Sequence, residues 1–145
     1  MSQVERFLSE KEENDIITAI RTAEKNTSGE IRIHIENTSK GDAYKRALEV
    51  FHYLKMDNTK AQNGVLIYVA VKDKTFVIYG DKGINEAVPK GFWNSTKDLM
   101  QGHFKVGNFK QGLIDSVLEA GKMLETYFPW QHGDINELPN TISKG

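Results

Sequence analysis

The run VLIYVAV, from Val65 to Val71, is apolar at every position, and this feature limits the fold of the chain more than any other. A strand with one face in water alternates between apolar and polar residues, whereas a run that is apolar in both phases needs cover on both faces. We therefore expect a central strand between two layers of helices. The charged turn Lys72–Lys74 follows, and the run TFVIY after it predicts a strand that returns antiparallel to the first.

An earlier segment, EIRIHIE from Glu30 to Glu36, predicts a strand with one buried face, because its isoleucines stand at every second position. The stretch between the two strands predicts a helix that begins after Asp42 and carries one apolar face. A strand, a helix and a strand in this order form a β-α-β unit, so the two strands should lie parallel.

Further helices follow from the helical spacing of apolar residues. One begins at Ser9, because a serine followed three residues later by Glu12 forms a capping box that satisfies two backbone amides. Two others cover residues 92–103 and 109–128. The predicted fold class is therefore α/β: a three-layer α/β/α sandwich with a mixed sheet, in which a β-α-β unit is joined by an antiparallel hairpin strand.

The chain of 145 residues fits one domain, which we assign to residues 1–128. Residues 129–145, PWQHGDINELPNTISKG, are polar and aperiodic and contain Pro and Gly. Such a composition is typical of a flexible C-terminal tail.

Charge and residue types exclude several classes of function. A net charge of −1 gives no electrostatic reason to bind nucleic acid or an anionic membrane. No apolar run is long enough for membrane insertion, and without cysteine there is neither a disulfide nor thiolate chemistry. The chain has no cysteine and its first residues lack the apolar middle of a signal peptide, so we expect a cytoplasmic location. We also expect a monomer.

Oxygen-bearing side chains should meet at one end of the predicted sheet. The two parallel strands begin at this end and the antiparallel strand finishes there, so distant segments converge. The helices before the parallel strands also end here, with the negative poles of their dipoles. Carboxylates, amides and carbonyls are the ligands that Ca²⁺ and Mg²⁺ prefer. The sequence therefore predicts a divalent-cation site with the metal ligands Asp81, Asp57, Glu30 and Asn63.

Two other interpretations stay open. Aspartate is common in turns, where it binds the local backbone, so Gly80-Asp81-Lys82-Gly83 can be a plain turn after a strand. The opposite end of the sheet offers Ser39, Lys40 and Asp42 at a helix start, together with Lys72 to Lys74, which suits an anion or phosphate. No complete hydrolase motif, Walker loop or His-x-x-x-His pair occurs, so the sequence assigns no catalytic residue and no organic cofactor.

Two longer stretches, NGVLIYVAVKDKTFVIYGDKGINEAV from Asn63 and GNFKQGLIDSVLEAG from Gly107, resemble the TPM domain family, also called the TPM phosphatase family. The segment SGEIRIHI from Ser28 is similar to the first strand of that family. The resemblance covers residues 7–128 and implies an α/β/α sandwich. It also implies divalent cation binding, and some members are described as acid phosphatases.

The resemblance has two departures. Members are commonly exported or tethered by a membrane helix, and some look tied to photosystem repair or receptor assembly, whereas we find neither signal nor membrane segment here. Many members have Gly-Tyr-Gly-x-Glu after the hairpin, where this chain has Gly80-Asp81-Lys82-Gly83-Ile84-Asn85. Asp81 thus adds an oxygen where relatives have an aromatic ring.

Three functions follow as expectations. The first is a binding or assembly module that takes Ca²⁺ or Mg²⁺. The alternative is a metal-assisted acid phosphatase acting on phosphomonoesters, with Asp57 or Glu30 as the base. The third is an interaction domain that docks a protein partner through an exposed surface, for example around Trp130.

Overall fold

The computed structural model describes residues 7–130, 138 and 140–145, and the strand built from the apolar run lies at its centre. This strand, β2, extends over Gly64–Ala70 and is buried at every residue. The other elements are α2 (Glu10–Glu24), β1 (Glu30–Glu36), α3 (Ala43–Tyr53), β3 (Thr75–Gly80), α4 (Lys82–Ala87), α5 (Asn94–Lys105), α6 (Phe109–Glu125) and β4 (Ser143–Lys144).

The strands form one sheet in the order β3-β2-β1-β4. β1 and β2 are parallel along their whole length, with Glu30 opposite Gly64 and Glu36 opposite Ala70. β3 returns antiparallel to β2, so that Gly80 lies opposite Val65. The predicted β-α-β unit and the hairpin strand are thereby confirmed.

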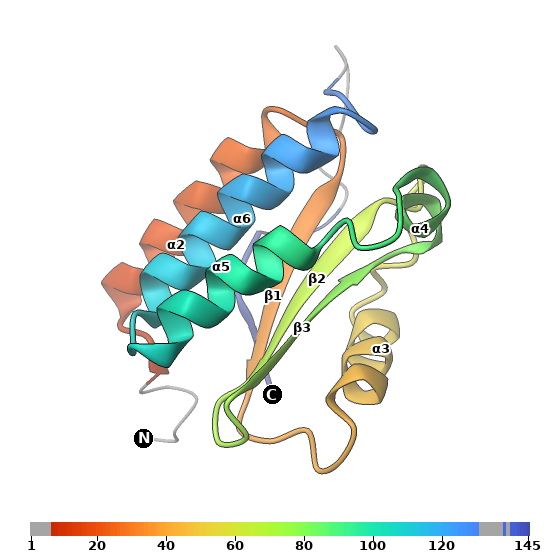
Figure 1. Cartoon of the computed structure of the whole chain (residues 1–145). Coiled ribbons are helices and arrows are strands. Elements are labelled where there is room, and N and C mark those ends of the chain that lie inside the picture. The colour runs from red at the N-terminus through yellow and green to blue at the C-terminus, as the bar shows by residue number, and fades with distance from the viewer. Residues whose placement is uncertain (1–6, 131–137, 139) are drawn as a thin grey trace.

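Helices cover both faces of this sheet (Figure 1). On one face α2, α5 and α6 pack over the inward side chains of the first two strands, which are Ile31, Ile33, Ile35, Val65, Ile67 and Val69. On the other face α3 covers a smaller core that includes Leu66 and Tyr68. Burial of one such side chain contributes about 1.5–3 kcal/mol, so β2 is stabilised from both sides. The three-layer sandwich is confirmed.

Two predicted helix starts are in place. The hydroxyl of Ser9 accepts from the amide of Glu12 at 3.1 Å, and the carboxylate of Glu12 accepts from the amide of Ser9 at 2.9 Å. Asp42 accepts from the amide of Lys45 at 3.1 Å and so begins α3. No helix in the described ranges is both long and apolar enough to cross a bilayer.

Two short elements differ from the sequence prediction. α4 has six residues and directly follows β3, where the sequence predicted only a turn. β4 has two residues and pairs parallel with β1, so that Ser143 lies opposite His34. Elements this short contain too few residues for a hydrophobic period to be visible in the sequence.

The end of the chain is partly seated on the domain. Leu138 is buried in the core under α3, and its amide donates to the carboxylate of Glu30 at 2.6 Å. The amide of Gly145 donates to the carbonyl of Ile35 at 2.9 Å. Residues 138 and 143–145 therefore contact the domain, where the sequence predicted a flexible tail. Residues 131–137 and 139 of the predicted tail lie outside the described residues. The domain boundary at residue 128 stays a prediction.

Candidate functional site

The sheet end predicted from topology exists in the structure. β1 and β2 begin there and β3 finishes there, while α2 leads into β1 and α3 leads into β2 through residues 54–63. Glu30 lies opposite Gly64, whose carbonyl accepts from the amide of Asp81 at 2.9 Å. Glu30, Gly64 and Asp81 therefore form one row across three strands.

Asp81 is the most unusual residue of this end. Its Oδ1 accepts from the amide of Lys82 at 2.7 Å and begins α4, whereas its Oδ2 is buried and has no hydrogen-bond partner in the described part of the chain. The residue is only 7% exposed. The ammonium of Lys82 lies 4.0 Å from the carboxylate of Glu86. A buried carboxylate oxygen without a donor or cation is unfavourable, so Oδ2 is the atom here that most needs a ligand.

The loop of residues 54–63 lies against the start of α4. The amide of Gly83 donates to the carbonyl of Gln62 at 2.9 Å, and the amide of Gln62 donates to the carbonyl of Thr59 at 3.3 Å. The hydroxyl of Thr59 is buried and, within the described residues, also lacks a partner. Lys55 and Gln62 have φ of 58° and 50°, a conformation that costs a residue other than glycine about 1–2 kcal/mol. A second oxygen without a partner in the described residues, that of Thr59, thus lies on a strained loop. This loop is joined to the start of α4 through the hydrogen bonds of Gln62.

Asp57 belongs to the same loop but is paired elsewhere. Its Oδ2 lies 3.0 Å from Nδ1 of His52, and the Asp57 side chain is 49% exposed. Exposed ion pairs contribute only about 0–1 kcal/mol, so this pair can be exchanged for another partner at little cost.

Glu30 and Asn63 also have protein partners. The carboxylate of Glu30, which is 4% exposed, accepts from the amide of Leu138. The side-chain amide of Asn63 donates to the hydroxyl of Ser28 at 3.2 Å, and the backbone carbonyl of Asn63 accepts from the amide of Glu30 at 3.2 Å. Both residues therefore hold the start of β1 in place.

These positions do not make a preassembled metal cluster. In residues 7–130, 138 and 140–145, no group of three or more His, Cys, Asp or Glu side chains is placed to hold a metal ion. The structure brings Asp81 and the 54–63 loop together, but the side chains of Asp57, Glu30 and Asn63 each have a hydrogen bond to another part of the chain. A cation at this end would need further oxygens in addition to carboxylates.

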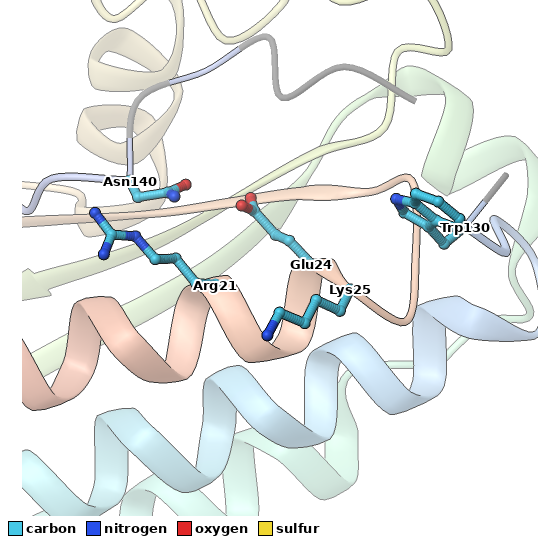
Figure 2. Close-up of a pocket in the computed structure, with 5 residues that line it drawn as sticks. All are labelled: Arg21, Glu24, Lys25, Trp130 and Asn140. Atoms are coloured by element: carbon cyan, nitrogen blue, oxygen red, sulfur yellow. The ribbon is translucent and has the colours of Figure 1, made fainter. Parts of the chain in front are cut away.

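A carboxylate that no sequence motif indicates lies beside Glu30. Glu24, near the end of α2, accepts from the amide of Ile31 at 3.0 Å. Burial raises the pKa of Glu24 to about 7; the Ile31 amide opposes this rise and the charge of Glu30 adds to it. Glu24 lines a hollow of about 410 Å³ together with Arg21, Lys25, Trp130 and Asn140. Figure 2 shows these five side chains. No sequence motif links Glu24 to Glu30, so only the fold reveals a carboxyl that titrates near neutral pH.

At the opposite end of the sheet, the chain's own carboxylates occupy the donors that an anion would use. Asp73 accepts from the amide of Ser39 and the hydroxyl of Thr38, each at 2.9 Å. The Ser39 amide and the Thr38 hydroxyl lower the pKa of Asp73. The carboxylate of Asp42 accepts from the amide of Lys45 at the start of α3. Because these donors are already bound to carboxylates, the structure does not favour the phosphate site that the sequence suggested.

A buried network lies deeper at that end. Arg46 binds both oxygens of Glu36, at 2.8 and 3.0 Å, and the Tyr68 hydroxyl donates to the same carboxylate. His34 lies 3.1 Å from it. Burial works against ionisation, but the hydrogen bonds from Arg46, Tyr68 and His34 hold the pKa of Glu36 down at about 2. Glu36 is therefore charged and bound to internal partners, as expected of a residue that stabilises the fold.

The chain is similar to a known protein family and to a solved structure. Residues 1–123 match the family model described as the TPM domain. The NMR structure of the BA42 protein from the psychrophilic bacterium Bizionia argentinensis is 65% identical, with 100% of both chains covered and a TM-score of 0.93. No curated protein matches the chain.

Two more distant structures are similar in fold alone. The N-terminal domain of a protein from P. gingivalis is 21% identical with a TM-score of 0.70, and covers 87% of this chain and 83% of its own. The N-terminal domain of the cg2496 protein from Corynebacterium glutamicum is 11% identical with a TM-score of 0.57, at 95% and 80% coverage.

Proposed function

The chain belongs to the TPM domain family, and from this premise we propose that it is a binding module that takes one divalent cation, Ca²⁺ or Mg²⁺, at the sheet end where Asp81 lies. The observation that carries the proposal is the buried Oδ2 of Asp81, which lacks a hydrogen-bond partner in the described part of the chain. An oxygen that has lost water without gaining a donor is strongly stabilised by a nearby cation.

The ligands come from two segments. Asp81 supplies the anionic oxygen, and the 54–63 loop supplies the hydroxyl of Thr59 and backbone carbonyls. Gly83 supports this arrangement, because a side chain there would approach the carbonyl oxygen of Gln62 to 2.6 Å and would also meet that of Ala61. A glycine is therefore what allows loop carbonyls to lie so close to the start of α4.

Asp57 is the second carboxylate of the proposed site. Its weak exposed pair with His52 leaves it able to turn toward a cation bound at the same loop. Glu30 and Asn63 are proposed as more distant supports, because each already binds a backbone or side-chain partner. One or two carboxylates with carbonyls and water correspond to a weak site, with a dissociation constant on the order of 10⁻⁴–10⁻³ M.

The test is an NMR titration of the metal-free protein with Ca²⁺ and with Mg²⁺. We expect the largest amide shifts in residues 57–63 and 80–86. Asp81→Asn removes the charge but keeps an oxygen that can accept from the amide of Lys82, so α4 should persist while the shifts disappear. Asp42→Asn is the matched control, since Asp42 also begins a helix through its carboxylate but lies at the opposite end of the sheet.

Two outcomes would contradict the proposal. One is a set of shifts that is unchanged by Asp81→Asn, and the other is a set confined to residues around Glu24 and Glu30.

The phosphatase alternative needs the same cation, so hydrolysis of an aryl phosphate that is lost both in Asp81→Asn and with a chelator would favour it. Binding without hydrolysis favours the binding module.

A further inference from the structure

The sheet has one covered edge and one open edge. At the β1 edge, β4 pairs with His34 and Ile35, and the carboxylate of Glu24 accepts a hydrogen bond from the amide of Ile31. At the other edge, β3 is the outermost strand, and no described strand pairs with its outer side (Figure 1). The open edge is therefore β3.

Backbone groups on this edge point outward. Because the amide of Asp81 binds the carbonyl of Gly64, alternate residues of β3 point their backbone groups toward β2. The amides and carbonyls of Phe76 and Ile78 then point to the open side. Thr75–Gly80 contains no charged residue and no proline, which are the usual means of preventing strand addition at an edge.

A hollow of about 1210 Å³ follows this edge. It is lined by Phe76 and Ile78, which face the large core, and also by Val77 and Tyr44, which lie on the α3 side. Because residues from both faces of β3 line one hollow, the hollow passes around the strand edge. One wall is α5, which exposes Asn94, Lys97, Asp98, Gln101 and Lys105 along one helical face.

The charges at this hollow differ from those of the whole chain. Lys74, Lys97 and Lys105 line it together with one acidic residue, Asp98, although the chain as a whole has a net charge of −1. These lysines favour an acidic occupant of the hollow, because opposite charges attract across an interface. They also disfavour a second copy of this chain, because pairing two β3 edges would bring two sets of lysines together.

We propose that the groove between β3 and α5 is a docking site for an extended acidic segment of a partner protein, which adds to the sheet as a further strand. The outward amides and carbonyls of Phe76 and Ile78 bind its backbone, and its alternate side chains enter the apolar hollow. Lys97 and Lys105 pair with acidic residues that flank the strand. This proposal is independent of cation binding, because the groove shares no residue with the site at Asp81.

The probe for the test is an acetylated and amidated peptide, Glu-Glu-Val-Thr-Val-Thr-Val-Glu, titrated into the full chain and followed by NMR. We expect amide shifts in residues 74–80 and 94–105. A peptide N-methylated at every residue of Val-Thr-Val-Thr-Val has no amide on either edge of this segment to donate to β3, so it should cause no shifts. A peptide with lysines in place of the glutamates should bind about tenfold more weakly at low salt.

Protein variants supply the second arm. Lys97→Glu combined with Lys105→Glu should weaken the acidic peptide about tenfold, whereas Lys122→Glu on the exposed side of α6 should not change its affinity. The proposal is overturned if the N-methylated peptide binds equally well, or if no shifts occur at millimolar peptide. It is also overturned if residues 74–80 shift with protein concentration alone, because a second copy would then occupy the edge.

Discussion

Replacing Gly83 by alanine should destabilise the protein, although alanine is the better helix former. Gly83 lies in α4, where its amide donates to the carbonyl of Gln62 at 2.9 Å. An added Cβ would lie 2.6 Å from that same oxygen and would also meet the carbonyl oxygen of Ala61. Both contacts are with backbone, so the loop or the helix has to move.

The magnitude follows from three contributions. Overpacking against fixed atoms costs about 1–3 kcal/mol, and this contact belongs at the upper end because backbone cannot change rotamer. Weakening the bond between Gly83 and Gln62 costs about 1 kcal/mol, and helix propensity returns about 1 kcal/mol. The net destabilisation is about 2–3 kcal/mol.

The matched control is Gly102→Ala in α5, where an added Cβ meets nothing within 4 Å. This variant should gain about 1 kcal/mol from helix propensity alone. Urea unfolding followed by circular dichroism measures both, and for a chain of this size 1 kcal/mol corresponds to about 2–4 °C in Tm. A Gly83→Ala protein as stable as the wild type would refute the close packing of the 54–63 loop on α4, and with it the loop carbonyls proposed as ligands.

Two further predictions concern buried carboxylates. Because the pKa of Glu24 rises from 4.5 to about 7 on folding, the protonated form stabilises the fold; the wild type should therefore lose up to about 3 kcal/mol between these pH values. Glu24→Gln should remove this loss in urea unfolding measured across that range, and an unchanged pH profile would contradict the assignment. Glu36→Gln should destabilise the protein by about 3 kcal/mol at neutral pH, because Arg46 loses its charged partner. Since the folded pKa of Glu36 is about 2 against 4.5, the wild type should lose stability as pH falls through this range while the variant should not, and equal acid sensitivity would count against the network.

The long elements could be predicted from the sequence because their signals are periodic. The apolar run at Val65 and the alternating isoleucines from Ile31 leave one arrangement in which every apolar side chain is covered, and the structure has it. The capping box at Ser9 and the aspartate at Asp42 begin the helices as predicted, because each satisfies amides that the helix itself cannot.

The short elements and the details of the site could not be predicted in this way. α4 begins within Gly-Asp-Lys-Gly, which also fits a turn. The bond from the amide of Asn85 to the carbonyl of Asp81 continues the chain as a helix, and the amide of Gly83 binds Gln62 of a loop that is distant in sequence. The pairing of Asp57 with His52 depends on the path of the loop, including the positive φ of Lys55, which no pattern encodes. The unusual pKa of Glu24 comes from burial beside β1 and exists only in the folded chain.

Calorimetric titration of the metal-free protein with Ca²⁺ shows whether Asp81 holds a cation when the wild type, Asp81→Asn and Asp42→Asn are compared side by side. We expect the wild type and Asp42→Asn to bind one ion with equal affinity and Asp81→Asn to bind at least about tenfold more weakly. Equal binding by the wild type and Asp81→Asn, or no binding by any of the three, would contradict this expectation.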